Sequence, residues 1–248
     1  IMTIFHHDYF KDVMFFSTKT DKILYTIDRG QTFHSFKTPV ASDDFTLSFH
    51  PDKKDWLIWV GKHCDDVSGS KSCFPAASIS TDRGDHWKTL LRYATKCEFT
   101  GNSAYKYRPL TQIVCLVHQE ENLESPKTIV TINDFLVDDK LVHHGTVASF
   151  ATMNEFILAT DEVTEAGKEK AGLQAIASLD GQHFEAAQFP YNFHDSHSSL
   201  YTVLDSSNHA VNLFVATDLS DGRRHGSIIK SNSNGTTYVL SASNVNSD

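Results

Sequence analysis

A short motif that returns about every fifty residues constrains the fold of this chain more than any other feature. The segment Thr26–Phe33 returns in full as Ser80–Trp87 and, one residue shorter, as Ser178–Phe184. Two weaker copies lie at Ser231–Tyr238 and Thr131–Phe135. The equivalent positions 28, 82, 133, 180 and 233 are separated by 54, 51, 47 and 53 residues. Such a period is typical of architectures in which each repeat is one supersecondary unit.

Each repeat contains short apolar runs rich in β-branched and aromatic residues, separated by Asp, Gly, Asn and Ser clusters. No segment keeps a 3.6-residue apolar period, and the best candidate for a helix is Asn154–Lys170. Four short strands per repeat are typical of a β-propeller blade. The sequence therefore predicts an all-β propeller fold of about five four-stranded blades, with approximate boundaries 1–40, 41–95, 96–140, 141–190 and 191–248.

The repeated motif is interpreted as a turn between two strands. In such a turn an Asp carboxylate accepts backbone N–H groups, a Gly provides a positive φ, and a closing aromatic ring packs between neighbouring blades. This pattern, the Asp box, predicts structural roles for Asp28, Gly30, Phe33, Asp82, Gly84, Trp87, Asp180, Gly181 and Phe184. Catalytic or calcium-binding carboxylates are the alternative, which is less favoured because turn-tip carboxylates point away from a propeller's central channel.

Four cysteines bear on the compartment of the protein. Cys64 and Cys73 enclose eight residues, Cys97 and Cys115 enclose seventeen, and neither spacing is that of a zinc or redox motif. Two locally close pairs favour disulfides Cys64–Cys73 and Cys97–Cys115 in an oxidising compartment. Four buried, reduced thiols in a cytosolic protein are the alternative. The sequon that begins at Asn234 makes that residue a candidate glycosylation site.

Charge and composition exclude some classes of partner. The net charge is −9, with 31 acidic and 22 basic residues, which argues against nucleic-acid binding. No apolar run is long enough to cross a bilayer, and the first ten residues lack the pattern of a signal peptide. Fourteen histidines would raise the formal charge to +5 if all were protonated. An acid response is therefore one hypothesis, and scattered surface histidines without such a role are the alternative.

Candidate metal and catalytic motifs are weak. The pairs His143-His144 and His194-x-x-His197 each lack a third ligand at a suitable spacing. The segment Asp218–Gly222 resembles part of a calcium loop without its downstream Glu. Neither a phosphate-binding loop nor a nucleophile elbow is present. The sequence predicts no metal, no cofactor and no catalytic site.

A set of segments in the second and third repeats resembles a known receptor family. It comprises His50-Pro51-Asp52, Trp56-Leu57, Gly61–Cys64, Cys73, Ser80–Trp87, Leu90-Leu91, Cys97 and Ile113–Cys115. These segments are similar to the lumenal domain of sortilin-type sorting receptors, especially the fungal receptors for a vacuolar carboxypeptidase. The resemblance implies about half of a ten-bladed propeller, in a receptor anchored by a membrane helix that is absent from this chain. A closed five-bladed propeller is the alternative.

The resemblance also implies a function. Receptors of this family carry soluble hydrolase precursors, such as a vacuolar carboxypeptidase, from the late Golgi to the endosome. Binding near neutral pH would be followed by release in the acidic endosome, and part of the histidine set would drive that release. The partner is then a protein or peptide, bound on the lumenal side of the membrane.

The family holds a ligand's C-terminal peptide against one blade wall, and two segments match that wall here. They would place four residues at the site: Leu158, Thr160, Tyr201 and Thr202. The family's carboxylate-binding Arg is missing, and Lys170 is the cation assigned to the site in its place. Ordinary strand roles for Tyr201 and Thr202 are the alternative.

Two other functional classes compete with the receptor interpretation. Sialidases and xyloglucan-type glycosidases also carry Asp boxes on propellers, but a sialidase needs an Arg cluster that the six arginines here do not provide. A passive protein-interaction scaffold is the other class. We expect a binding protein rather than an enzyme.

Overall fold

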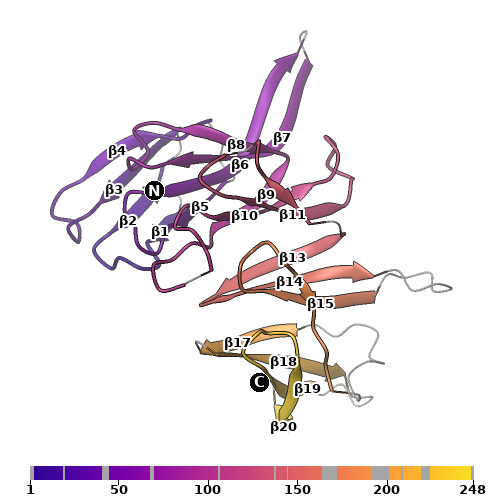
Figure 1. Cartoon of the computed structure of the whole chain (residues 1–248). Helices are drawn as coiled ribbons and strands as arrows, with labels where there is room; N and C mark the ends of the chain where they lie inside the picture. Colours follow the sequence, from indigo (N-terminus) through magenta and orange to yellow (C-terminus); the bar gives the residue numbers. More distant parts are fainter. Residues whose placement is uncertain are drawn as a thin grey trace. The chain divides into compact units, whose positions relative to one another are not determined.

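The computed structural model describes residues 3–18, 20–40, 45–67, 70–105, 107–136, 138–143, 145–163, 172–190, 201–207, 209–218 and 224–246. These residues contain strands and turns but no helix, and therefore no helix long enough to cross a membrane. The strands form five antiparallel sheets of four strands each (Figure 1). In every sheet the strands are ordered as they follow along the chain, which is the pattern of a propeller blade.

The strands have the following bounds. The first blade contains β1 (Ile4–His6), β2 (Met14–Ser17), β3 (Lys22–Thr26) and β4 (His34–Lys37). The second contains β5 (Phe45–Phe49), β6 (Leu57–Val67), β7 (Ser70–Ser80) and β8 (Lys88–Arg92). The third contains β9 (Ala94–Phe99), β10 (Ile113–His118), β11 (Lys127–Ile132) and β12 (Leu141–Val142). The fourth contains β13 (Val147–Met153), β14 (Phe156–Val163), β15 (Gly172–Ser178) and β16 (Glu185–Ala186). The fifth contains β17 (Tyr201–Ser207), β18 (Ala210–Asp218), β19 (Arg224–Ser231) and β20 (Tyr238–Asn246).

The predicted all-β fold of five four-stranded blades is confirmed. The candidate helix at Asn154–Lys170 is wrong for its described residues, 154–163. Strand β14 occupies Phe156–Val163 and pairs with β13 on one side and β15 on the other. Consecutive residues Phe156, Ile157 and Leu158 are all buried. A strand buried on both faces has a continuous apolar run, so it lacks the alternation that identifies a strand with one face in solvent.

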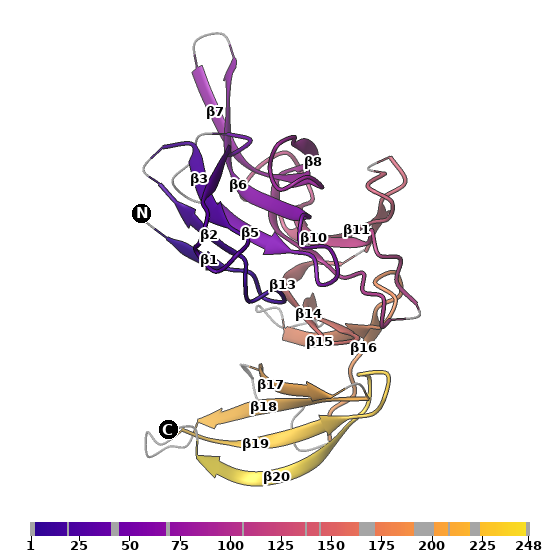
Figure 2. The ribbon, with the colours of Figure 1, turned by 90° about the vertical axis from the view of Figure 1, so that its left-hand side faces the viewer.

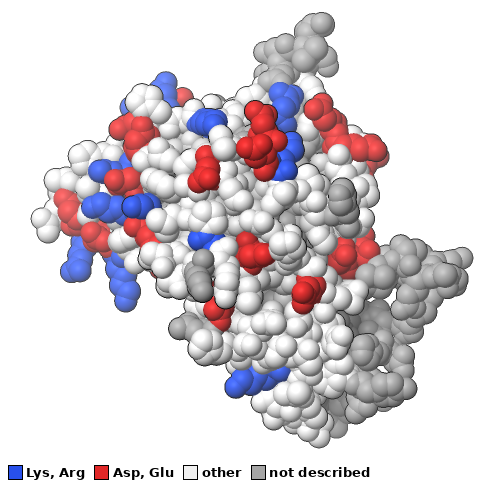
Figure 3. Space-filling view, viewed as in Figure 1, with Lys and Arg blue, Asp and Glu red and all other residues white. Residues whose placement is uncertain are grey.

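The first three blades form one compact unit, residues 1–142. Two apolar clusters lie at its seams, by which we mean the contacts between neighbouring blades. The first-to-second seam contains Phe15, Tyr25, Phe36 and Phe49, and is largely aromatic. The second-to-third seam is built from aliphatic residues, Phe99 and the pair Cys97 and Cys115. Trp56 and Phe135 pack against it. On the face in Figure 3, basic and acidic side chains of this unit are interspersed rather than gathered in one basic patch.

One hairpin of the second blade extends beyond its sheet. Strand β5 pairs with β6 as far as Gly61, and β8 pairs with β7 as far as Ala76. The rest of β6 and β7 pair only with each other and form a two-stranded arm, visible at the top of Figure 1. A ribbon of two strands is marginally stable alone, so this arm depends on its cross-link, described below.

The fourth and fifth blades form the second unit, residues 143–248. Figure 2 shows the four strands of the fifth blade side by side, in the order β17 to β20. The seam between these blades contains Phe156, Leu158, Leu213, Ile229 and Tyr238. It also contains Ala175, Ala177 and Ala187, so small side chains make up much of this contact.

Candidate functional site

Strand β14 carries the first two residues of the predicted peptide site. Leu158 and Thr160 are two positions apart and share one face of the strand. Their partners on β15 are Ala177 and Ala175. Leu158 is buried in the seam with the fifth blade, and Thr160 is partly exposed. The strand thus brings an apolar group and a hydroxyl group together.

A cavity of about 160 Å³ lies beside these two residues. Its lining comprises Ser149, Phe150, Ala151, Leu158, Ala159, Thr160, Ala175, Ile176, Ala187, Leu213, Gly235 and Tyr238. Five of these twelve are Ala or Gly, which leaves space that larger side chains would fill. Pockets for small organic molecules are usually about 300–1,000 Å³. This cavity is suited to one apolar side chain, with the Ser149 and Thr160 hydroxyls as polar groups in its lining.

The structure does not place the other predicted site residues at this cavity. Tyr201 and Thr202 lie on β17, where their backbones pair with Val215 and Phe214. Their side chains are not described, and Lys170 lies outside the described residues. A ligand site made of all five residues stays a prediction.

The Asp boxes are closed by hydrogen bonds within the turn. In the first box the Thr32 backbone N–H donates to Asp28 Oδ1 at 2.9 Å, and the Thr26 and Thr32 hydroxyls donate to the same carboxylate. The Gly30 N–H in turn donates to Thr26 Oγ1 at 2.8 Å. These bonds lower the pKa of Asp28 to about 2, because they favour the ionised form.

The second and fourth boxes use a histidine where the first uses Thr32. His86 Nδ1 lies 2.6 Å from Asp82 Oδ2, and His183 Nδ1 lies 2.7 Å from Asp180 Oδ2. Both imidazoles are exposed, and their hydrogen bonds to the carboxylates raise the pKa of each histidine. Burial opposes ionisation of Asp180, but its hydrogen bonds outweigh that effect and lower its pKa to about 2. In all three boxes the Asp carboxylate accepts hydrogen bonds from its own turn, which supports a structural role.

The fifth box is closed by a residue that the sequence analysis missed. The predicted equivalent of the Asp was position 233, but Asn232 Oδ1 accepts the backbone N–H groups of Asn234, Thr236 and Thr237 at 3.0–3.3 Å. An Asn side chain forms such turns as readily as Asp. The signal available was this Asn one position earlier than the register of the other boxes.

The closing aromatic residues differ in their surroundings. Trp87 lies over Phe36 of the first blade at 5.9 Å, and its Nε1 donates to the Lys37 carbonyl at 3.1 Å. Tyr238 packs against Phe189, next to the fourth blade, at 5.1 Å. Each of these rings contacts the preceding blade. Phe33 of the first blade is 57% exposed, so its predicted burial between blades is wrong for the described residues.

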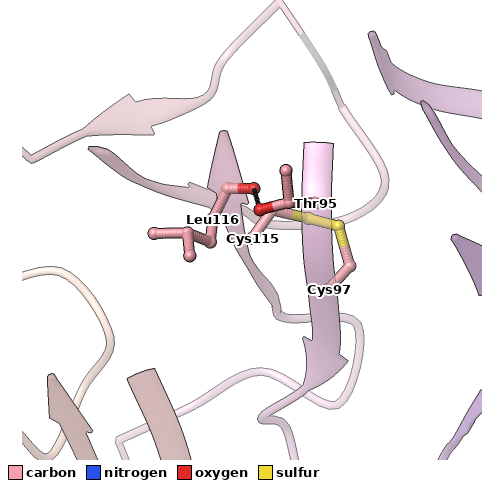
Figure 4. Close-up of a disulfide and its surroundings, with 4 residues drawn as sticks. All are labelled: Thr95, Cys97, Cys115 and Leu116. Carbon is pink, nitrogen blue, oxygen red and sulfur yellow. Dashed lines mark hydrogen bonds between the residues drawn. A yellow bond between two sulfur atoms is a disulfide. The ribbon is translucent and has the colours of Figure 1, made fainter. Parts of the chain in front are cut away.

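Both expected cysteine pairs are disulfide-bonded. Cys64 and Cys73 face each other across β6 and β7, within the arm of the second blade. Cys97 and Cys115 face each other across β9 and β10, beside the hydrogen bond from Thr95 Oγ1 to the Leu116 carbonyl (Figure 4). The first pair is accessible to solvent and the second is buried. Each bond closes a short loop and contributes about 2–3 kcal/mol to stability.

Two buried histidines were not expected from the sequence. His7 and His50 begin equivalent hairpins, between β1 and β2 and between β5 and β6, and both are at most 4% exposed.

No group of three or more His, Cys, Asp or Glu residues that could hold a metal occurs among the residues described. His144, His194–His197 and most of the Asp218–Gly222 motif lie outside them.

Comparisons with known proteins agree with the propeller fold and add a family. The family model described as sortilin, neurotensin receptor 3 (Sortilin-Vps10), matches residues 1–248. Vacuolar protein sorting/targeting protein 10 of Fusarium vanettenii is 98% identical over 248 residues, which are 100% of this chain and 16% of that protein. The protein of the same name from Colletotrichum graminicola is 60% identical over 246 residues, with 98% and 16% covered. The chain therefore corresponds to a small part of these relatives.

Two solved structures resemble the chain in fold. The β-propeller domain of the Trilobed protease from Pyrococcus furiosus has a TM-score of 0.53 at 10% identity, covering 92% of this chain and 66% of that one. The uncharacterized protein lmo1340 from Listeria monocytogenes has a TM-score of 0.55 at 8% identity, covering 94% and 66%. Likeness at such identities concerns the fold alone.

Proposed function

The chain belongs to the sortilin/Vps10 family, and we propose that it is a ligand-binding, lumenal segment of a membrane-anchored receptor that sorts soluble proteins. The observation that carries this proposal is the family match over all 248 residues. The relatives are named as vacuolar sorting proteins, which supports soluble vacuolar hydrolase precursors, such as a carboxypeptidase, as cargo. Transport would run from the late Golgi to the endosome.

We further propose that the five blades are part of a larger propeller. Trp87 and Tyr238 each pack on the blade that precedes their own. Phe33 occupies the same position in the first blade and is 57% exposed. A preceding blade packed against the first one would cover this ring, as the ten-bladed arrangement implied by the family requires.

The proposed ligand site lies in the second unit, at Leu158, Thr160, Tyr201 and Thr202, with Lys170 close to the ligand's carboxylate. The cavity beside Leu158 and Thr160 supports this placement, because it can take one apolar side chain of a peptide. A Lys ammonium would pair with a C-terminal carboxylate as a point charge, without the two parallel hydrogen bonds of an Arg.

Binding of peptides to the immobilised chain tests the site. The probe is a synthetic peptide with the C-terminal sequence of a vacuolar carboxypeptidase precursor, measured at pH 7 with a free carboxylate and with a C-terminal amide. We expect the amide to bind at least tenfold more weakly, because it loses the charge that Lys170 would pair with. Equal affinity of both forms would contradict the proposed site.

Two leucine variants separate the cavity from the rest of the fourth blade. Ala151→Leu adds volume in the cavity lining, whereas Ala186→Leu adds the same volume at an exposed position of β16. We expect only Ala151→Leu to weaken peptide binding, provided that both variants keep the wild-type circular dichroism spectrum.

A turnover assay on sialosides and glucans addresses the glycosidase alternative. Failure to bind any precursor or peptide would instead favour the scaffold.

Asn234 is the proposed glycosylation site. It is exposed in the turn of the fifth blade, where a glycan would extend into solvent. Thr236→Ala removes the sequon and Thr236→Ser keeps it. In protein secreted from a fungal host, we expect an endoglycosidase-sensitive mobility shift in the wild type and in Thr236→Ser only. A shift that persists in Thr236→Ala would contradict the assignment.

A further inference from the structure

The hairpins that begin at His7 and His50 are built alike. Each has the pattern His-x-x-x-Lys-Asp. In each, the backbone N–H of the histidine donates to the backbone carbonyl six residues later, at 3.3 Å. The backbone N–H groups of Arg29 and Arg83, in the Asp boxes, donate to the carbonyls of Asp12 and Asp55. The hairpin and the box of one blade are therefore joined at the same end of the blade.

Each buried imidazole closes its hairpin as a hydrogen-bond acceptor. His7 Nδ1 accepts the N–H groups of Tyr9 and Phe10, both at 3.3 Å. His50 Nδ1 accepts those of Asp52 and Lys53, at 2.9 and 3.0 Å. Two N–H donors directed at one nitrogen require that this nitrogen carry no proton, so the proton of the neutral ring is on Nε2.

Each imidazole also contacts the next blade. The His7 ring stacks on Phe49 of the second blade at 4.6 Å. His50 Nε2 donates to the Leu110 carbonyl of the third blade at 2.8 Å, and its ring meets Phe99 at 4.9 Å. The two histidines thus lie on the two seams of the first unit.

We propose that His7 and His50 form an acid-sensitive latch, which holds the two seams of the first unit closed while the rings are neutral and releases them when the rings are protonated. A proton on Nδ1 would face two N–H donors instead of accepting from them. The hairpin would lose both hydrogen bonds, and a charged ring would be enclosed by aromatic side chains. This device is a property of the blades and does not depend on the proposed ligand.

Burial keeps the two rings neutral at physiological pH, although a nearby carboxylate opposes it at each ring. Burial lowers the pKa of His7 to about 4, against the opposing effect of Asp12, and His50 of the second blade lowers it further. Burial also lowers the pKa of His50, with Asp52 and the Leu110 carbonyl opposing and Lys53 adding to the shift. Because each folded-state pKa lies below its unfolded value, the latch stabilises the seams at neutral pH and weakens as pH falls below about 6.5.

Hydrogen exchange of the whole chain at pH 7 and pH 4.5, with labelling times corrected for intrinsic exchange, tests the latch. A histidine with a pKa of about 4 when closed and about 6.5 when open raises the opening equilibrium on the order of 50-fold between these conditions. We expect a loss of this size in the amides of residues 7–13, around His7. We expect a loss in the same direction in residues 50–56 and 100–105, around His50. Unchanged protection would overturn the proposal.

A double variant and a control identify the groups responsible. The double variant carries His7→Asn and His50→Asn. Its amide oxygens can accept the hairpin N–H groups, just as Asn232 Oδ1 accepts backbone N–H groups in its own turn, but they cannot be protonated. We expect this variant to lose the pH dependence, and His6→Asn, at the exposed neighbouring position, to keep it. Full pH dependence in the double variant would overturn the proposal. If that variant does not fold, imidazole NMR titration of the wild type decides: ordinary pKa values for both rings would equally overturn it.

Discussion

The first and second Asp boxes have the same turn but different surroundings. In both, a backbone N–H donates to the Asp Oδ1 at 2.9 Å, and Arg29 and Arg83 have φ values of 60° and 61°. Trp87 of the second box nevertheless packs on the first blade, whereas Phe33 of the first box is 57% exposed. The conformation of the turn is therefore determined by its own eight residues. The stability that its closing residues contribute depends instead on their contacts with the preceding blade.

The two box glycines give the largest expected contrast. Gly30 and Gly84 have φ values of 88° and 94°, so alanine is strained at either position, by about 1–2 kcal/mol. A Cβ at Gly84 would also lie 2.5 Å from the buried Phe36 ring, whereas at Gly30 the nearest group is 3.8 Å away. We expect Gly84→Ala to lower the free energy of unfolding by about 3 kcal/mol in total. Gly30→Ala should lose only the strain, and equal losses in urea denaturation would contradict the contrast.

The second largest contrast is expected in the loss of stability when each closing aromatic residue is replaced. Trp87→Ala removes a half-buried indole and its hydrogen bond to the Lys37 carbonyl, which should cost roughly 2–3 kcal/mol. Phe33→Ala should change stability by less than about 0.5 kcal/mol, as at an exposed site. The comparison is sharpened in a longer receptor that supplies the proposed preceding blade. There Phe33→Ala should become destabilising, and an unchanged effect would count against the larger propeller.

The smallest expected difference concerns pH. The hydrogen bond to Asp82 raises the pKa of His86, so its contribution is complete below its unfolded pKa of 6.5 and is lost as pH rises through the raised value. Thr32 fills the same position in the first box and does not titrate. The quantity to compare is the thermal midpoint at pH 6 minus that at pH 8. We expect this difference to be about a degree smaller in His86→Thr than in the wild type, and larger in Thr32→His. Identical pH profiles for both variants would contradict this role.

The box histidines and the hairpin histidines respond to acid in opposite directions. His86 and His183 gain a favourable pair when protonated, whereas His7 and His50 lose their acceptor role. A total count of fourteen histidines therefore says little about acid response. What decides the sign is whether each ring faces a carboxylate or a backbone N–H group.

The sequence was informative where structure is local. The box pattern and its period predicted five blades, because a turn and its flanking strands are encoded within a few residues. The burial of His7 and His50 was not predictable, since it arises from contacts with the next blade. The resemblance named Leu158 and Thr160, but the other residues that line the cavity were not predictable for the same reason, because the cavity lies where two blades meet. The role of Asn232 was missed because the turn is shifted by one residue.

The central claim, a lumenal segment of a sorting receptor, is tested most directly by peptide mapping without reduction, on protein purified from its native source. Alkylation of free thiols before digestion prevents disulfide exchange during the analysis. The account predicts two cross-linked peptides, one with Cys64–Cys73 and one with Cys97–Cys115. Four alkylated cysteines would place the chain in a reducing compartment and contradict the lumenal assignment.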